Sequence, residues 1–190
     1  MRRSSKSKNG NTIVRALNDL GLAAWFGGSL MGAIGLNGAA AQVDPPRERA
    51  KVANAGWARW TPANLAAIGA YTVGSLALTG ANRSRLAGQK GVARTAIIKT
   101  ILTAAAMGAT AYSRALGQKV IDATPPVEGA TEPSDSTPPE VADAQRKLKV
   151  LQWAVPALTG ATVILNSKMG EQQRPSEVSK GVVRRLTPAA

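Results

Sequence analysis

Residues 20–43 read LGLAAWFGGSLMGAIGLNGAAAQV and carry no charge over 24 positions between Asp19 and Asp44. A helix needs about 20 predominantly apolar residues to cross the hydrocarbon core of a bilayer, so this run is long enough to span one. Four of the twelve residues in 24–35 are glycine, and in water each costs about 1 kcal/mol against alanine in a helix interior. In lipid the helix persists because unpaired backbone groups cost more than weak helix propensity. We therefore predict a membrane helix over about 20–43.

Three further runs with few or no charges follow the first. They cover residues 60–82, about 95–115 and about 149–167. Pro62 suits the first turn of a helix, where its missing N–H is no loss. Lys99 lies one turn inside its run, and a lysine near a helix end can extend its ammonium to the interface. The sequence therefore predicts an all-α integral membrane bundle of four transmembrane helices.

The segments outside these runs differ in composition. Residues 1–15 form a basic N-terminal segment, and 169–190 form a basic, polar tail. The membrane domain covers 16–168 and includes a loop at 120–145 that is rich in proline and acidic residues. Low hydrophobicity with high charge is typical of disorder, so we predict a disordered acidic loop there. A soluble alanine-rich bundle is the alternative, but runs of 24 and 23 uncharged residues leave no charged helix face for water.

Lysine and arginine dominate the charge, with a formal net charge of +13 and a pI near 11.0. These bases flank the uncharged runs in short clusters, as expected at a surface of anionic lipid. They do not form one patch with interleaved aromatic rings, which argues against nucleic acid as a partner. With the N-terminus inside and Lys99 left uncounted, fourteen bases lie on the cytoplasmic side and nine outside. The positive-inside rule then predicts that both termini are cytoplasmic.

Small residues recur four positions apart in three of the runs. This spacing lets helix backbones approach closely in lipid, and it predicts packing within the chain, contact with another protein or homo-oligomer, or a ligand groove. The residues are Gly28, Gly32 and Gly35 in the first run, Ala70 and Gly74 in the second, and Ala104 and Gly108 in the third.

A second group of side chains is expected at the membrane interface. Tryptophan prefers the headgroup level because its ring is buried there while its N–H stays wet, and basic side chains meet lipid phosphates at the same depth. These predicted interfacial or lipid contacts are Trp25, Trp57, Arg59, Trp60, Lys99 and Trp153.

Catalytic chemistry has little support in the sequence. Histidine and cysteine are absent, which removes the commonest general base, the thiolate nucleophile and the usual ligands of zinc and haem. We expect no catalytic residue, metal or cofactor, and we treat a membrane enzyme as the least favoured class. The leading hypothesis is a non-catalytic scaffold or accessory subunit of a complex in a bacterial cytoplasmic membrane. The alternative is a small carrier that binds a lipid or small molecule in a groove between the first two helices, lined or gated by Gly28, Gly32, Trp57, Arg59 and Trp60.

Overall fold

The computed structural model describes residues 4–83, 91–123 and 127–171 of the chain, and these residues are almost entirely helical. The first long helix is continuous through α1 (Ser4–Met31), a π-helical segment (Gly32–Leu36) and α2 (Asn37–Ala40). A short 3₁₀ turn (Pro46–Glu48) precedes α3 (Arg49–Ala81), which is followed by α5 (Val92–Ala123) and α6 (Pro139–Glu171). The described residues contain no β-strand, only one isolated bridge between Val127 and Pro133.

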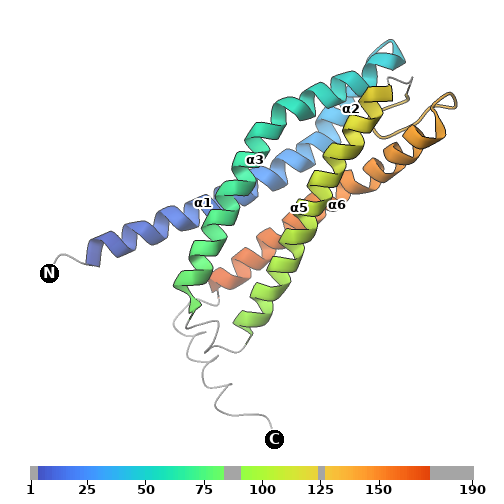
Figure 1. The fold of residues 1–190 in the computed structure, drawn as a ribbon. Coiled ribbons are helices and arrows are strands. Elements are labelled where there is room, and N and C mark those ends of the chain that lie inside the picture. Colours follow the sequence, from blue (N-terminus) through green and yellow to red (C-terminus); the bar gives the residue numbers. More distant parts are fainter. Residues whose placement is uncertain (1–3, 84–90, 124–126, 172–190) are drawn as a thin grey trace, which may run out of the picture.

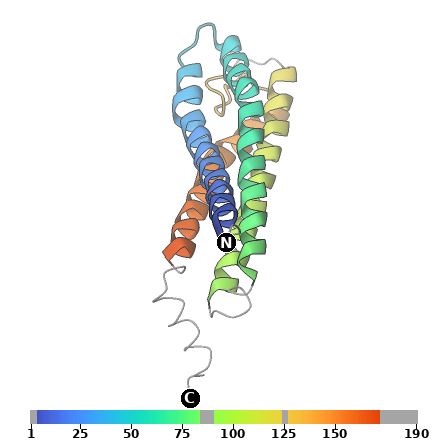
Figure 2. The same cartoon turned by 90° about the vertical axis from the view of Figure 1, so that its left-hand side faces the viewer.

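The long helices form two antiparallel hairpins (Figures 1 and 2). The first pairs α1 with α3, the second pairs α5 with α6, and α1 also packs against α6. The α1–α3 connection and the loop between α5 and α6 lie at one end of the molecule, which we call the loop end. The end of α3, the start of α5 and the end of α6 lie at the other end (Figure 1).

Two glycines allow α1 and α3 to touch backbone to backbone. A Cβ atom added at Gly21 would lie 2.5 Å from the carbonyl oxygen of Ala67 and 2.6 Å from the amide nitrogen of Tyr71. One added at Gly74 would lie 2.6 Å from the amide nitrogen of Asn18. Gly74 belongs to the small-residue pattern of the sequence, whereas Gly21 does not. On α1, the backbone contact with α3 at Gly21 therefore lies about two to four turns before Gly28, Gly32 and Gly35, the glycines of the predicted small-residue pattern.

Polar side chains join three helices at the same level. The side-chain amide of Asn18 lies 2.6 Å from the hydroxyl of Ser75 and 2.7 Å from the amide of Asn166. These contacts tie α1 to both α3 and α6. Hydrogen bonds of this kind replace the hydrophobic drive that helices lack when lipid surrounds them.

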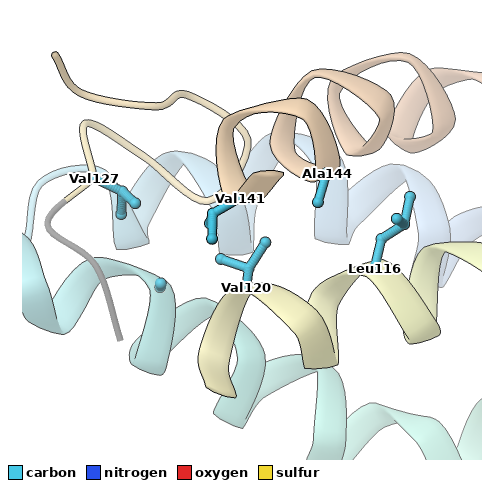
Figure 3. Close-up of a cluster of buried hydrophobic side chains, with 6 residues drawn as sticks. Leu116, Val120, Val127, Val141 and Ala144 are labelled. Atoms are coloured by element: carbon cyan, nitrogen blue, oxygen red, sulfur yellow. The ribbon is translucent and has the colours of Figure 1, made fainter. Parts of the chain in front are cut away.

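The acidic segment expected to be disordered is ordered wherever the structure describes it. Val120 lies in the last turns of α5, α6 begins at Pro139, and Val127 in the loop is fully buried. Figure 3 shows Val127 beside Val120 and Val141, in a cluster that also holds Ala50, Leu116 and Ala144. The prediction of disorder over 120–145 was wrong for these residues because the segment's acid and proline content masks apolar side chains that pack together.

The side chain of Gln145, on α6, holds the same loop in place. Its side chain is fully buried, and its Nε2 donates to the carbonyl oxygen of Gly129 at 3.0 Å. The loop therefore covers the end of the bundle as a packed element.

Within the described ranges, three helical segments are long and apolar enough to cross a membrane: Thr12–Ala40, Val92–Ala123 and Pro139–Glu171. These segments indicate a multi-pass membrane protein. The predicted span at 60–82 lies in α3 with its C-cap, and α3 is not among the segments that meet this criterion in the described part of the chain. At 1.5 Å per residue the 33-residue α3 is about 50 Å long, which is longer than the hydrocarbon core.

The outer surface of the bundle carries large apolar side chains. Leu76 on α3 is 69% exposed and Ile164 on α6 is 70% exposed. The other long helices also carry exposed apolar side chains. They include Leu20 and Ile34 on the first long helix, Leu65 and Val73 on α3, and Ile97 and Ile101 on α5. A soluble monomer rarely shows apolar residues on so many faces. This surface suits contact with lipid acyl chains.

Candidate functional site

A cavity of about 570 Å³ lies between the two hairpins, toward the loop end. Sites for small molecules typically measure about 300–1,000 Å³, so the cavity has the volume of a ligand site. We call it the inter-hairpin cavity. Its wall includes Trp25 and Ser29 of α1, Met107 and Arg114 of α5, Leu148, Leu151 and Val155 of α6, and Ala130 and Thr131 of the loop. The rest of the wall comes largely from α3.

One face of α3 supplies a stripe of polar side chains to this wall. Asn54, Trp57, Thr61 and Asn64 recur every three or four residues, which places them on the same side of the helix. The hydroxyl of Thr61 donates to the carbonyl oxygen of Trp57 at 2.8 Å. These side chains give the cavity a polar wall on the α3 side.

A chain of hydrogen bonds crosses the cavity wall near the loop. Trp57 Nε1 donates to Asn37 Oδ1 at 2.9 Å, and Asn37 Nδ2 donates to Gln152 Oε1 at 2.9 Å. Gln152 Nε2 then donates to the hydroxyl oxygen of Thr131 at 3.3 Å. The chain links α3, α2, α6 and the loop, so it holds this end of the cavity in one arrangement. In the sequence, Asn37 is a single polar residue within the uncharged run at 20–43.

Two polar atoms of the cavity residues have no hydrogen-bond partner in the part of the chain that the structure describes. They are the indole N–H of Trp60 and the side-chain oxygen of Asn64, and both atoms are buried. An unpaired buried donor or acceptor costs about 1–3 kcal/mol. Both atoms are closed off from the cavity as well as from solvent, and the indole of Trp60 packs against Gly28 of α1.

Arg114 is the charged residue among the side chains that line the cavity. It lies on α5 and donates a hydrogen bond to Asn54 Oδ1 across the gap to α3. No aspartate or glutamate joins it in the cavity wall that the structure describes. Sequence analysis did not single out Arg114, because an arginine at the end of a predicted span is typical of an ordinary interfacial anchor.

Trp25 is not an interfacial residue. Its side chain is only 1% exposed, its Nε1 donates to the hydroxyl of Thr110 at 3.3 Å, and its ring centroid lies 6.2 Å from that of Tyr71. The prediction of lipid contact was wrong for this tryptophan because it faces the centre of the bundle. Trp153, by contrast, is 51% exposed on α6, and Arg59 is also exposed.

The glycines of the first run lie against tryptophan rings of α3. A Cβ atom at Gly28 would overlap the indole of Trp60, and one at Gly32 would overlap the indole of Trp57. These glycines therefore make room for aromatic side chains of the same chain. Together with Gly35 they border a second cavity of about 320 Å³. We call it the glycine groove, and it is the place where sequence analysis expected a ligand between the first two helices, although Arg59 is not among its lining residues.

The remaining predicted residues fall outside both cavities. Ala70 is half-buried, whereas Ala104 and Gly108 are exposed, and a Cβ atom added at Gly108 would meet no atom of the described chain within 4 Å. The ammonium of Lys99 lies 5.2 Å from the centroid of the Tyr71 ring. Lys99 is half-buried and packs over an aromatic face of α3, instead of extending freely to the interface.

Within the described ranges no group of three or more histidine, cysteine, aspartate or glutamate side chains is placed to hold a metal ion. Comparison of the chain with protein-family models, with curated proteins and with solved structures finds no match. The two cavities and the side chains around them are thus the features that bear on function.

Proposed function

We propose that this chain is a membrane protein that binds a small amphiphilic molecule in the inter-hairpin cavity. The observation that carries the proposal is the cavity itself, whose volume of about 570 Å³ combines apolar walls with a few polar side chains, among them Asn54, Thr61 and Arg114. Known small-molecule sites share this composition, a mostly apolar pocket with a few placed polar groups. This function corresponds to the small carrier or lipid-binding class.

Filling the cavity tests this function. Ala53 is 4% exposed and lines the cavity, so the larger side chain of Ala53→Phe enters ligand space. The probe is tetradecanol carrying a photoactivatable diazirine, added to the protein in lipid nanodiscs, and the adducts are located by mass spectrometry. We expect adducts on the cavity segments of α3 and α5 and a loss of about fivefold to tenfold in labelling for Ala53→Phe, from the usual cost of overpacking.

Ala58→Phe is the matched control, because Ala58 lies one turn further along α3, is exposed and does not line the cavity. Its labelling should equal that of the unaltered chain. Adducts spread evenly over the lipid-facing surface, or equal labelling of both variants, would contradict a ligand site in the cavity.

The membrane setting of the proposal is a four-helix bundle in a bacterial cytoplasmic membrane with both termini cytoplasmic. It is supported by the charge bias of the sequence and by the fold, in which the end of α3, the start of α5 and the end of α6 share one end of the molecule (Figure 1). Because the chain has no cysteine, single cysteines give a background-free test. A cysteine at Ser136 in the loop should react with an impermeant maleimide from the outside of whole cells, and one at Ser167 should not.

A scaffold or accessory subunit is the second candidate, and the exposed small-residue face of α5 favours it. Ala104 and Gly108 lie four residues apart on a face that no described part of the chain covers, and such pairs suit close helix contact in lipid. Cross-linking in mild detergent should then capture a stoichiometric partner or a second copy. A monomer under several detergents would count against it.

A further inference from the structure

The inter-hairpin cavity is open on one side, between α3 and α5. Leu65 of α3 and Ala111 of α5 line the cavity and are also exposed on the outside of the bundle, whereas the other described lining residues are buried or half-buried. Leu65 is 63% exposed. A residue that borders the cavity and also faces the outside marks an opening. The cavity therefore meets the surroundings of the bundle between these two helices.

The packing of the helices explains why the opening lies there. α1 packs closely on α3 and α5 packs closely on α6, and α1 also packs on α6, whereas α3 and α5 make few contacts with each other. Toward the loop end, Arg114 donates a hydrogen bond to Asn54 across the gap. At the other end of the gap, the hydroxyls of Tyr71 and Thr103 lie 2.7 Å apart. Between these contacts α3 runs for about 25 Å, and the cavity lies along this stretch.

Both ends of the cavity are closed by protein. At the loop end, Thr131 is buried and accepts a hydrogen bond from Gln152 Nε2 at 3.3 Å, while Gln145 holds the loop against α6. Toward the other end, the rings of Trp25 and Tyr71 pack together, and each side chain is only 1% exposed. The route into the cavity therefore runs sideways between α3 and α5, and not from the water through the loop.

The opening lies at the depth of lipid acyl chains. Ala111 belongs to the 14 uncharged residues from Thr100 to Ser113 in the third predicted span, so hydrocarbon surrounds it in the membrane. Arg114 comes directly after this run and is half-buried at the loop-end edge of the opening. Basic side chains at that level meet lipid phosphates. From its edge inward, the opening thus offers first a cation and then an apolar space, which is the order of phosphate and acyl chain in a phospholipid.

We infer that one acyl chain of a bilayer phospholipid enters the inter-hairpin cavity sideways between α3 and α5, while its second chain and its head group stay in the membrane. This inference rests on the proposed function and adds the class of ligand and its route of entry. The inserted chain lies against Ile68, Met107 and Leu151, which line the cavity. It supplies contact atoms to apolar side chains that face empty space without it. The phosphate stays at the edge of the opening, where the guanidinium of Arg114 binds its oxygens.

A photoactivatable phospholipid tests the inference. The probe is phosphatidylglycerol with a diazirine in the middle of one acyl chain, incorporated at a low fraction into lipid nanodiscs that hold the protein. Adducts are located by mass spectrometry at single residues. On the unaltered chain we expect adducts at Trp25, Ser29 and Val155, which line the cavity and are all buried. Lipid that only surrounds the bundle labels exposed side chains instead.

Ala111→Trp places a large side chain in the opening and should lower the labelling of Ser29 and Val155 about tenfold, a factor near the lower end of the usual cost of overpacking. Ala115→Trp is the matched control, because Ala115 is exposed one turn further along α5 and does not line the cavity. Its labelling should equal that of the unaltered chain.

Two outcomes would overturn the inference and leave the proposed function standing. One is equal labelling of the buried residues in Ala111→Trp and Ala115→Trp. The other is an unaltered chain in which tetradecanol labels the cavity but the phospholipid labels exposed positions alone, and this outcome decides the matter even if Ala111→Trp fails to fold. Absence of cavity labelling by both probes would instead overturn the proposed function.

Discussion

Gly21→Ala should destabilise the bundle by about 3 kcal/mol, the upper part of the range for an overpacked core. The added methyl group would lie 2.5 Å from the carbonyl oxygen of Ala67 and 2.6 Å from the amide nitrogen of Tyr71. Both neighbours are backbone atoms of a continuous helix, so neither can rotate away as a side chain can. The hairpin must open to accept the methyl group. The measurement is the midpoint of thermal unfolding in detergent, followed by circular dichroism.

Gly27→Ala is the matched control on the same helix. A Cβ atom at Gly27 meets no atom of the described chain within 4 Å, so the change adds helix propensity without a collision. It should leave the unfolding midpoint unchanged or raise it slightly. If Gly21→Ala unfolds at the same temperature as Gly27→Ala, the close packing of α1 on α3 is wrong.

The helical class and the helix positions were predictable because they depend on long uncharged runs. Residues 20–43 fall within the first long helix up to Ala40, and the run at 149–167 lies inside α6. Lengths could not be predicted as well, since α3 begins at Arg49, about three turns before the expected start. Charged and polar residues mark the end of an apolar run in the sequence. They do not end the helix itself, because a helix can continue beyond the membrane into water.

The candidate site was predictable only in part. Sequence spacing drew attention to Trp57 and Trp60 beside Gly28 and Gly32, and the structure brings these four residues together. The reason is side-chain fit, however, and not backbone contact. Glycines spaced four residues apart predict a helix face without side chains, but they do not predict which neighbouring group packs against that face.

Arg114 and Asn64 show why the inter-hairpin cavity itself could not be predicted from the sequence. Each is an unremarkable polar residue in the sequence, and their significance depends on the relative placement of α3 and α5. The hydrogen bond between Arg114 and Asn54 joins residues 60 positions apart. Composition and periodicity describe one helix at a time, so they carry no information about a wall that four helices share.

Trp25→Ala should also weaken the fold strongly, by about 3 kcal/mol, the lower end of the usual cost of removing a buried aromatic side chain. The lower end applies because a helix that unfolds within lipid loses packing but does not expose its side chains to water. The indole fills the space between Tyr71 and the inter-hairpin cavity. Its loss therefore enlarges a void that the neighbours already fail to fill. Trp25→Phe keeps most of the ring and removes the hydrogen bond to Thr110, so it should cost about 1 kcal/mol.

Trp153→Ala is the control that distinguishes the cost of removing a buried tryptophan from the general effect of losing any tryptophan. Trp153 is 51% exposed, and substitutions at such surface positions usually change stability by less than about 0.5 kcal/mol. Unfolding midpoints of the three variants in one detergent should thus fall in the order Trp153→Ala, Trp25→Phe, Trp25→Ala, from highest to lowest. Equal midpoints for the two alanine variants would mean that Trp25 faces lipid, as an interfacial tryptophan does. In that case α1 is rotated about its axis, and the wall it gives to the cavity is a different set of residues.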